Sequence, residues 1–317
     1  MALDDATSAL LAAFRAAGRP PLTEQTPQQA RDAGIAARVN NPRGPEMARV
    51  DDLVLDAAPY GGTEGSFRLR VLVPPGEVRA VFVFYHGGGW VLGDIDGHDA
   101  VGRLLAQQTR SAVVMVDYRK APEFRYPVAV QDAWAALRWT ADHLADIASP
   151  DVPLIVGGDS AGGNLATVVA RRARDEGGPD LALQVLIYPV TDADLETSSY
   201  RDPENALLLS RDSMIWFFDH YVPDPAQRSD PDVSPLLAAD LSGLPAAIVL
   251  TCEHDVLRDE GEAYARALES AGVAVDFERL AGQMHGFFPM VGILPSSTAT
   301  VDRIAESVDT ILAATAS

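Results

Sequence analysis

Short apolar runs alternate with helical stretches over most of the chain. Continuous apolar runs, typical of parallel strands buried on both faces, occupy 80–85, 112–117, 153–156, 183–188 and 246–251. Strand-like patterns also occupy 67–73, with a period of two residues, and 273–280. Helical stretches lie at about 98–109, 130–146, 161–176, 259–271 and 298–314. Because strands that alternate with helices form a sheet covered by helices on both faces, the pattern predicts an α/β fold with a mostly parallel central sheet.

Two segments depart from this alternation. Residues 5–17 have the pattern of an amphipathic helix, and Thr26, followed by proline and then by Gln29, has the signature of a capped helix start. The segment 192–243 is too long for a plain connection and carries a cluster of aromatic residues. We therefore predict the following parts: N-terminal cap helices at 1–45, a catalytic domain at 46–191 and 244–317, and a helical cap insertion at 192–243. The alternative is that the insertion contains an ordinary helix packed on the core.

The composition narrows the classes of partner. The chain has 317 residues and a formal net charge of −20. This charge argues against nucleic acid and against anionic membranes, both of which require clusters of basic residues. The first residues are acidic where a signal peptide is basic, and the short apolar run that follows cannot span a bilayer. We therefore expect a cytoplasmic protein without stable membrane insertion. The sequence leaves open whether the protein forms a homodimer.

The most informative motif is Gly158-Asp-Ser-Ala-Gly162, which follows an apolar strand and opens a helical stretch. This is the context of a nucleophile elbow, in which a strained strand-to-helix turn exposes the serine oxygen. The two glycines leave room where the backbone is crowded, and the new helix directs its first amides at the site. The motif predicts that Ser160 is a nucleophile.

A second motif, His86-Gly-Gly-Gly-Trp90, ends an earlier strand. Consecutive glycines allow a loop to turn its backbone N–H groups inward, where they can bind a developing oxyanion. We therefore expect the amides of Gly87, Gly88 and Gly89 to form an oxyanion hole together with the amide of Ala161. The two motifs together are far more specific than either alone.

A serine nucleophile needs a base and an acid that orients the base. His285 follows the last predicted strand, and Asp255 follows the strand that ends near 251, so both reach the same sheet edge as Ser160. The chain order Ser, Asp, His is the one that this kind of fold uses. Asp259 is the nearest rival to Asp255 and is expected to begin the next helix. The other histidines lie in the glycine loop, beside the acid, or on stretches without a partner signal, and they are His86, His254, His98, His143 and His220.

These motifs resemble those of the hormone-sensitive-lipase-like group of α/β-hydrolases, the bacterial family IV esterases. The resemblance runs from about residue 50 to the C-terminus. Besides the two motifs above, it rests on Asp117-Tyr-Arg-Lys-Ala-Pro-Glu123, which departs from the family pattern at Lys120, on Asp255-Val-Leu-Arg-Asp-Glu-Gly261, and on Met284-His-Gly-Phe287. The resemblance implies that Gly88, Gly89 and Ala161 donate the oxyanion amides. It also implies hydrolysis of short- to medium-chain acyl esters without a cofactor.

The sequence thus predicts a serine carboxylesterase that acts through an acyl-enzyme, with a small-molecule ester as its partner. No metal site is expected, because the run from Asp94 to Asp99 has neither calcium-loop nor zinc-site spacing. The substrate pocket is assigned to residues near the nucleophile and in the insertion, namely Trp90, Asp159, Tyr188, Trp216 and Phe217. Two alternatives stay open: an amidase, formamidase or deacetylase on a specific metabolite, and a non-catalytic small-molecule receptor.

Overall fold

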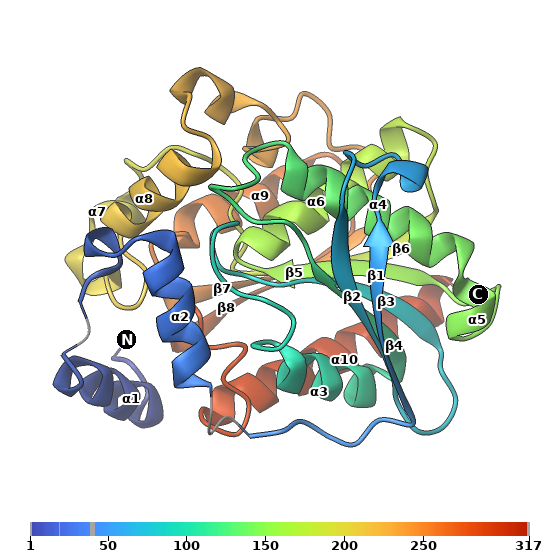
Figure 1. Cartoon of the computed structure of the whole chain (residues 1–317), viewed down its shortest axis with the longest axis horizontal. Coiled ribbons are helices and arrows are strands. Elements are labelled where there is room, and N and C mark those ends of the chain that lie inside the picture. The colour runs from blue at the N-terminus through green and yellow to red at the C-terminus, as the bar shows by residue number, and fades with distance from the viewer. Residues whose placement is uncertain (1, 19, 39–41, 316–317) are drawn as a thin grey trace.

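A single eight-stranded sheet organises the molecule, seen here in a computed structural model that describes residues 2–18, 20–38 and 42–315 (Figure 1). The strands are β1 (Arg49–Asp56), β2 (Ser66–Val73), β3 (Ala80–Tyr85), β4 (Ser111–Asp117), β5 (Leu154–Asp159), β6 (Leu181–Ile187), β7 (Ala246–His254) and β8 (Val275–Met284). Their order across the sheet is β1-β2-β4-β3-β5-β6-β7-β8. From β4 to β8 all neighbouring strands are parallel, whereas β2 runs antiparallel to both β1 and β4. The predicted α/β fold with a mostly parallel sheet is therefore confirmed.

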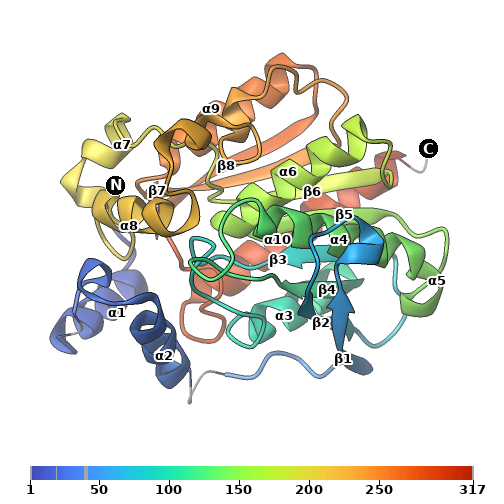
Figure 2. The ribbon, with the colours of Figure 1, turned by 45° about the horizontal axis from the view of Figure 1, so that its top comes forward.

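The central strands are buried on both faces, as their continuous apolar runs predicted. Along β3, Val81, Val83 and Tyr85 join the core on one face, whereas Phe82 and Phe84 join the core on the other. Helices α4 (Val128–Asp142), α6 (Ala161–Asp175) and α9 (Arg258–Ser270) cover the first face, and α3 (Asp99–Thr109) and α10 (Pro295–Thr315) cover the second (Figures 1 and 2). This three-layer arrangement brings the C-terminal ends of β3, β5, β7 and β8 to one edge of the sheet.

Two features of the fold differ from the sequence prediction. Strand β1 was not predicted; it lies at the edge of the sheet, and Leu55 is its only buried residue, so its apolar pattern is weak. The helix expected over 130–146 is divided at His143 into α4 and the short α5 (Leu144–Ile147). Edge strands need apolar residues on one face at most, which explains the missing signal.

The N-terminal segment and the insertion form a helical layer beside the sheet edge (Figures 1 and 2). The N-terminal segment holds α1 (Asp5–Ala16), η1 (Leu22–Glu24) and α2 (Pro27–Ala37), and α2 begins with the predicted capping box between Thr26 and Gln29. The insertion holds α7 (Ser198–Arg201), η3 (Pro203–Asn205), α8 (Arg211–Tyr221), η4 (Pro225–Ser229) and η5 (Pro235–Leu237). Helix α8 packs against η1, so two segments distant in the sequence meet in this layer.

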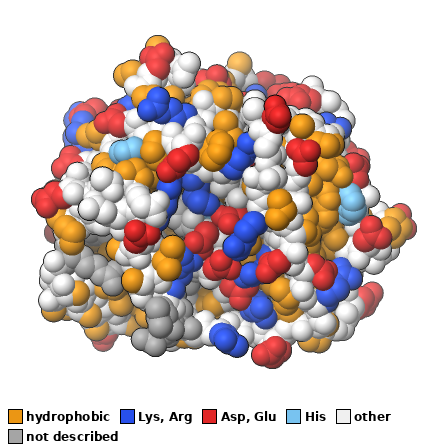
Figure 3. Space-filling view, viewed as in Figure 1, with side chains coloured by type: hydrophobic (Ala, Val, Ile, Leu, Met, Phe, Trp, Pro, Cys, Tyr) orange, Lys and Arg blue, Asp and Glu red, His pale blue; other side chains and the backbone are white. Residues whose placement is uncertain are grey.

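The charged residues are arranged in ion pairs over much of the surface. Figure 3 shows acidic and basic side chains interspersed across the middle of one face. On strand β2, for example, Arg70 contacts the carboxylates of Asp52, Asp96 and Asp99 at 2.7–3.1 Å. Across the described ranges, none of the helices combines the length and the apolar character that a membrane crossing requires.

Candidate active site

Ser160 stands on the turn between β5 and α6, at the C-terminal edge of the sheet. Its backbone has φ 56° and ψ −119°, a strained conformation for a residue with a side chain. The amide of Ser160 is held by the carbonyl of Ile187 at 2.9 Å, which fixes the turn against β6. A side chain at Gly158 or Gly162 would clash with the carbonyl of Tyr85 on β3. The glycines therefore allow β5, α6 and β3 to approach closely enough to form the elbow.

The structure brings Ser160, His285 and Asp255 together in one hydrogen-bonded chain. His285 follows β8, and its Nε2 lies 3.0 Å from the Oγ of Ser160. Its Nδ1 lies 2.8 Å from the Oδ2 of Asp255, which follows β7. Asp255 is fully buried, and its second carboxylate oxygen accepts the amide of Leu257 at 2.9 Å. This is the geometry in which an oriented imidazole can take a proton from a serine hydroxyl.

The rival acid, Asp259, has different partners. Its Oδ2 accepts the amide of Ser199 at 2.8 Å, and its Oδ1 pairs with Arg258. Asp259 lies in the first turn of α9, as expected, where a carboxylate is favoured by the helix dipole. It therefore holds α7 of the insertion against α9, while Asp255 contacts His285.

The glycine loop after β3 lies beside Ser160, but its three amides differ. The amide of Gly87 donates to the Oδ1 of Asp159 at 2.8 Å. In the described part of the chain, the amides of Gly88 and Gly89 have no hydrogen-bond acceptor, and both glycines line the cavity that contains Ser160. Ala161 is the first residue of α6, where a helix leaves its amide unpaired. The geometry thus favours Gly88, Gly89 and Ala161 as the donors and corrects the inclusion of Gly87, whose N–H is already used.

Gly88 has φ +120°, and a Cβ at this position would clash with the carbonyl of Leu92. We therefore expect Gly88→Ala to move the loop and lower kcat by about 10²–10³-fold, the usual cost of losing an oxyanion donor. Gly76→Ala is the matched control, because Gly76 also has positive φ (+92°) but has open space around it. Steady-state kinetics of both variants measure the loss in kcat, and thermal unfolding measures any loss of stability. Equal losses in the two variants would mean that backbone strain alone explains the effect.

A cavity of about 470 Å³ opens above Ser160 and His285. Its walls come from both segments outside the sheet. The N-terminal segment contributes Pro20, Leu22, Gln25, Ala30, Ala33 and Gly34, and the insertion contributes Leu208, Leu209, Met214 and Phe217. The volume falls in the range of small-molecule sites, and the lining is largely apolar. The sequence predicted cap helices in the N-terminal segment but not which of their residues face the cavity, because alanine and glycine positions on a short helix do not reveal what they face.

Of the residues assigned to the substrate pocket, only some line the cavity. Asp159 and Phe217 line the cavity. Trp90, Tyr188 and Trp216 do not, which corrects the prediction. Trp90 is fully buried and stacks on Tyr221 at 4.4 Å between ring centroids. These large rings pack layers together, and proximity in the sequence to the nucleophile or the insertion does not determine which of their faces meets the cavity.

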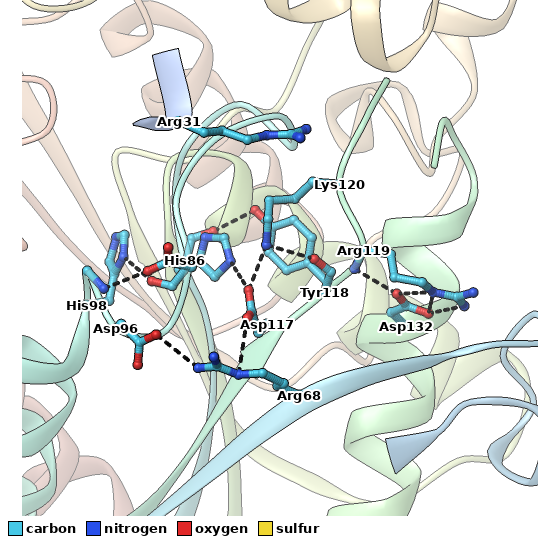
Figure 4. A network of polar contacts seen from close by, with 12 residues as sticks. Arg31, Arg68, His86, Asp96, His98, Asp117, Tyr118, Arg119, Lys120 and Asp132 are labelled. Atoms are coloured by element: carbon cyan, nitrogen blue, oxygen red, sulfur yellow. Dashed lines mark hydrogen bonds and ion pairs between the residues drawn. The ribbon is translucent and has the colours of Figure 1, made fainter. Parts of the chain in front are cut away.

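A polar network supports the glycine loop from behind (Figure 4). The Tyr118 hydroxyl donates to the carbonyl of His86 at 2.9 Å, and the two rings stack at 4.4 Å. Asp117 lies 3.8 Å from the Nε2 of His86 and accepts from Lys120 at 2.6 Å. Burial opposes ionisation of Asp117, but His86 and Lys120 outweigh it and hold the pKa of this carboxyl well below its usual range. Lys120, the position that departs from the family pattern, thus anchors Asp117 behind the loop.

Helix α2 is tied to the same loop by arginines. Arg31 donates to the carbonyls of Val91 and Ala121 at 2.9 and 2.6 Å and forms a bidentate pair with Glu123. Arg38 pairs with Asp94 on the following turn. The acidic run that begins at Asp94 is therefore engaged in ion pairs. Among the described residues, no cluster of histidine, cysteine and carboxylate side chains is arranged to hold a metal ion.

Comparisons with known proteins identify the family of the chain. Residues 82–289 match a family described by the α/β-hydrolase fold. Carboxylesterase NlhH of Mycobacterium tuberculosis is 43% identical over 242 residues, which cover 74% of this chain and 75% of that protein. The ethyl acetate hydrolase of Pseudomonas putida is 39% identical over 236 residues, with 74% of each chain covered.

A solved structure extends the similarity to nearly the whole chain. An ester hydrolase from the metagenome of Lake Arreo, solved with a bipyridine phosphonate derivative, superposes with a TM-score of 0.91 at 37% identity, covering 98% of this chain and 99% of the other. The family match spans more than half of the chain and includes the elbow, the glycine loop, Asp255 and His285. The chain therefore belongs to the α/β-hydrolase family, in its hormone-sensitive-lipase-like group.

Proposed function

We propose that this protein is a serine carboxylesterase that hydrolyses small acyl esters through an acyl-enzyme. One observation carries the proposal: the hydrogen-bonded chain from Ser160 through His285 to Asp255 lies at the base of an apolar cavity. The relatives described above are named as a carboxylesterase, an ethyl acetate hydrolase and an ester hydrolase, which supports ester hydrolysis for this chain as well.

The mechanism follows from the partners of each atom. The Nε2 of His285 accepts the Ser160 proton as Oγ attacks the ester carbonyl, and the amides of Gly88, Gly89 and Ala161 stabilise the resulting oxyanion. His285 then protonates the departing alcohol, which leaves an acyl-enzyme. In the second half, His285 removes a proton from water, and the acid is released from Ser160. Asp255 keeps the Nδ1–H of His285 in place and stabilises the imidazolium.

We further propose that the N-terminal segment 1–45 and the insertion 192–243 act together as a cap. Support comes from the cavity, to which both segments contribute walls, and from the packing of α8 on η1. Phe217 lies directly over Gly89, where any side chain at the glycine would clash with the phenyl ring. The cap therefore limits the space available to the acyl or alcohol group next to the glycine loop.

The experiment that tests the activity is a p-nitrophenyl ester series from acetate to palmitate, together with anilide analogues and a serine-reactive phosphonate. We expect the protein to hydrolyse the esters, and we expect this turnover to stop when the phosphonate labels Ser160. Faster cleavage of anilides than of matched esters would favour the amidase alternative. Absence of any turnover, with binding of the compounds retained, would favour a receptor.

The same series gives a prediction about chain length. Each buried methylene gains about 0.8 kcal/mol, or roughly fourfold in kcat/KM, until the cavity is full. We expect rates to rise through short acyl chains and to fall before palmitate. Phe217→Ala enlarges the cavity and is expected to move the optimum to longer chains.

Ile215→Ala is the matched control, because Ile215 lies on the same helix, is only half-buried and does not line the cavity. Its optimum is expected to stay in place even if its stability falls. Highest kcat/KM on palmitate, with a rate increase above the solubility limit, would contradict a cavity of limited size and identify a lipase.

A further inference from the structure

Asp159 lies between the nucleophile and the glycine loop, and its carboxylate is buried. It is only 3% exposed. Its Oδ1 accepts the amide of Gly87 at 2.8 Å, and its Oδ2 lies 3.4 Å from the hydroxyl of Tyr188. The Tyr188 ring packs against the His285 imidazole, with 4.5 Å between ring centroids. The carboxylate therefore contacts the glycine loop directly, through Gly87, and the base indirectly, through Tyr188.

A buried carboxylate is stable only if it is paired, and His98 supplies the pairing charge. The Nε2 of His98 lies 3.5 Å from the Oδ1 of Asp159, and its Nδ1 lies 3.1 Å from the backbone carbonyl of Asp94. Both ring nitrogens thus face oxygen acceptors, an arrangement that suits the imidazolium, in which both nitrogens are donors. Figure 4 shows His98 beside His86, at one end of the network.

The charges around His98 agree with this protonation state. Burial opposes the charge, but Asp159, and with it Asp94, outweighs burial and raises the pKa of His98 above its ordinary value. The other groups that face it are the rings of Phe84 and of His86, whose own pKa is lowered by burial. Asp94 is itself neutralised by Arg38, so Asp159 and His98 form the compensating pair.

We propose that the buried His98–Asp159 ion pair is a positioning pair that holds the oxyanion hole in its working geometry. The inference rests on the proposed function. Asp159 fixes the Gly87 N–H, and because Gly88 and Gly89 follow directly in the chain, the direction of their amides depends on that anchor. Without the charge of His98, Asp159 is left unpaired beside the loop. It then takes up a proton or turns toward water, and its bond to Gly87 weakens.

The deciding variant is His98→Gln, which keeps a donor but removes the charge, and Asp159→Asn is the reciprocal change. His143→Gln is the matched control, because His143 lies at the end of α4 and bonds to the carbonyl of Trp139, outside the site. Active sites are counted first by phosphonate titration, so that a loss of folded protein does not enter the rates. We expect kcat per titrated site to fall by about 10- to 100-fold in His98→Gln, less than the loss of a whole oxyanion donor, with KM changed less than threefold.

A transition-state analogue separates positioning from general damage. A trifluoromethyl ketone accepts the Ser160 oxygen at its carbonyl carbon, the serine proton moves to His285, and the new oxyanion sits in the hole. Its Ki should rise in parallel with the fall in kcat/KM in His98→Gln and Asp159→Asn, and the double variant should be little worse than either single one. His143→Gln should match wild type in all three readouts.

Unchanged kcat per site and unchanged ketone affinity in His98→Gln would overturn the inference while leaving the esterase proposal intact. A raised KM with kcat unchanged would overturn it too, since it would assign His98 to substrate binding. If His98→Gln does not fold, the nearly isosteric Asp159→Asn decides by the same measurements. Failure of the esterase proposal itself would appear differently, as wild-type protein that neither turns over esters nor is labelled at Ser160.

Discussion

Ser160→Ala and His285→Ala should each abolish nearly all ester turnover, with losses in kcat on the order of 10⁶. The reason is the direct hydrogen bond of 3.0 Å between Nε2 of His285 and Oγ of Ser160, which makes nucleophile and base a single unit. Steady-state kinetics on a short-chain p-nitrophenyl ester, with circular dichroism to verify folding, measure the effect. Residual activity would come from the glycine loop and the cavity, which remain in place.

The double variant gives the sharper test of this unit. Because either substitution already removes the concerted attack, Ser160→Ala combined with His285→Ala should be hardly slower than the single variants. His143→Ala should retain wild-type rates, since this histidine lies at the end of α4. Losses that add up in the double variant would show that the two residues act independently, contrary to the proposed mechanism.

Asp255→Asn should lower kcat by about 10⁴-fold, the second largest effect. The carboxylate of Asp255 accepts from the Nδ1 of His285 at 2.8 Å and is fully buried, whereas an amide can present its NH₂ and favour the wrong tautomer. The amide of Leu257 still has an oxygen to which it can donate, so the loop should keep its shape. Comparison of kcat and melting temperature with those of wild type separates chemistry from folding.

Asp259→Asn is the matched control for this prediction. It lies four positions along the chain from Asp255, and its carboxylate holds the amide of Ser199 instead of the histidine. We expect a modest loss of stability, of about 1 kcal/mol for a weakened capping-type hydrogen bond, with kcat nearly unchanged. If Asp259→Asn is the crippled variant and Asp255→Asn is not, the acid of the triad has been assigned to the wrong residue.

Much of the fold follows from local patterns in the sequence. The buried strands are recognisable because a strand covered on both faces must be apolar at every position, as β3 is. The elbow is recognisable because a strained serine between two close backbones requires glycine on both sides. The chain order and the predicted strand ends were enough to place Ser160, Asp255 and His285 at one edge of the sheet. The structure has them there within hydrogen-bond distance.

Edge and surface elements were harder to predict, because their residues meet fewer constraints. Strand β1 has only one buried position, so neither a continuous apolar run nor a clear alternation marks it. The cavity walls on α2, namely Ala30, Ala33 and Gly34, are small residues whose direction depends on how α2 docks. That docking is made by Arg31, which reaches Glu123 across 92 positions of the chain, and no local pattern contains such a contact.

The same distinction separates the residues that carry the chemistry from those that support it. Catalytic motifs impose their backbone requirements within a few residues, and the sequence alone was therefore sufficient to propose Ser160 as the nucleophile, with its glycine loop. The use of the Gly87 amide by Asp159, 72 positions away, and the burial of His98 beside that carboxylate arise only when β3, β5 and the turn before α3 pack together. Charge pairing in a core depends on which groups lose water together, and that is decided by the packing of the layers.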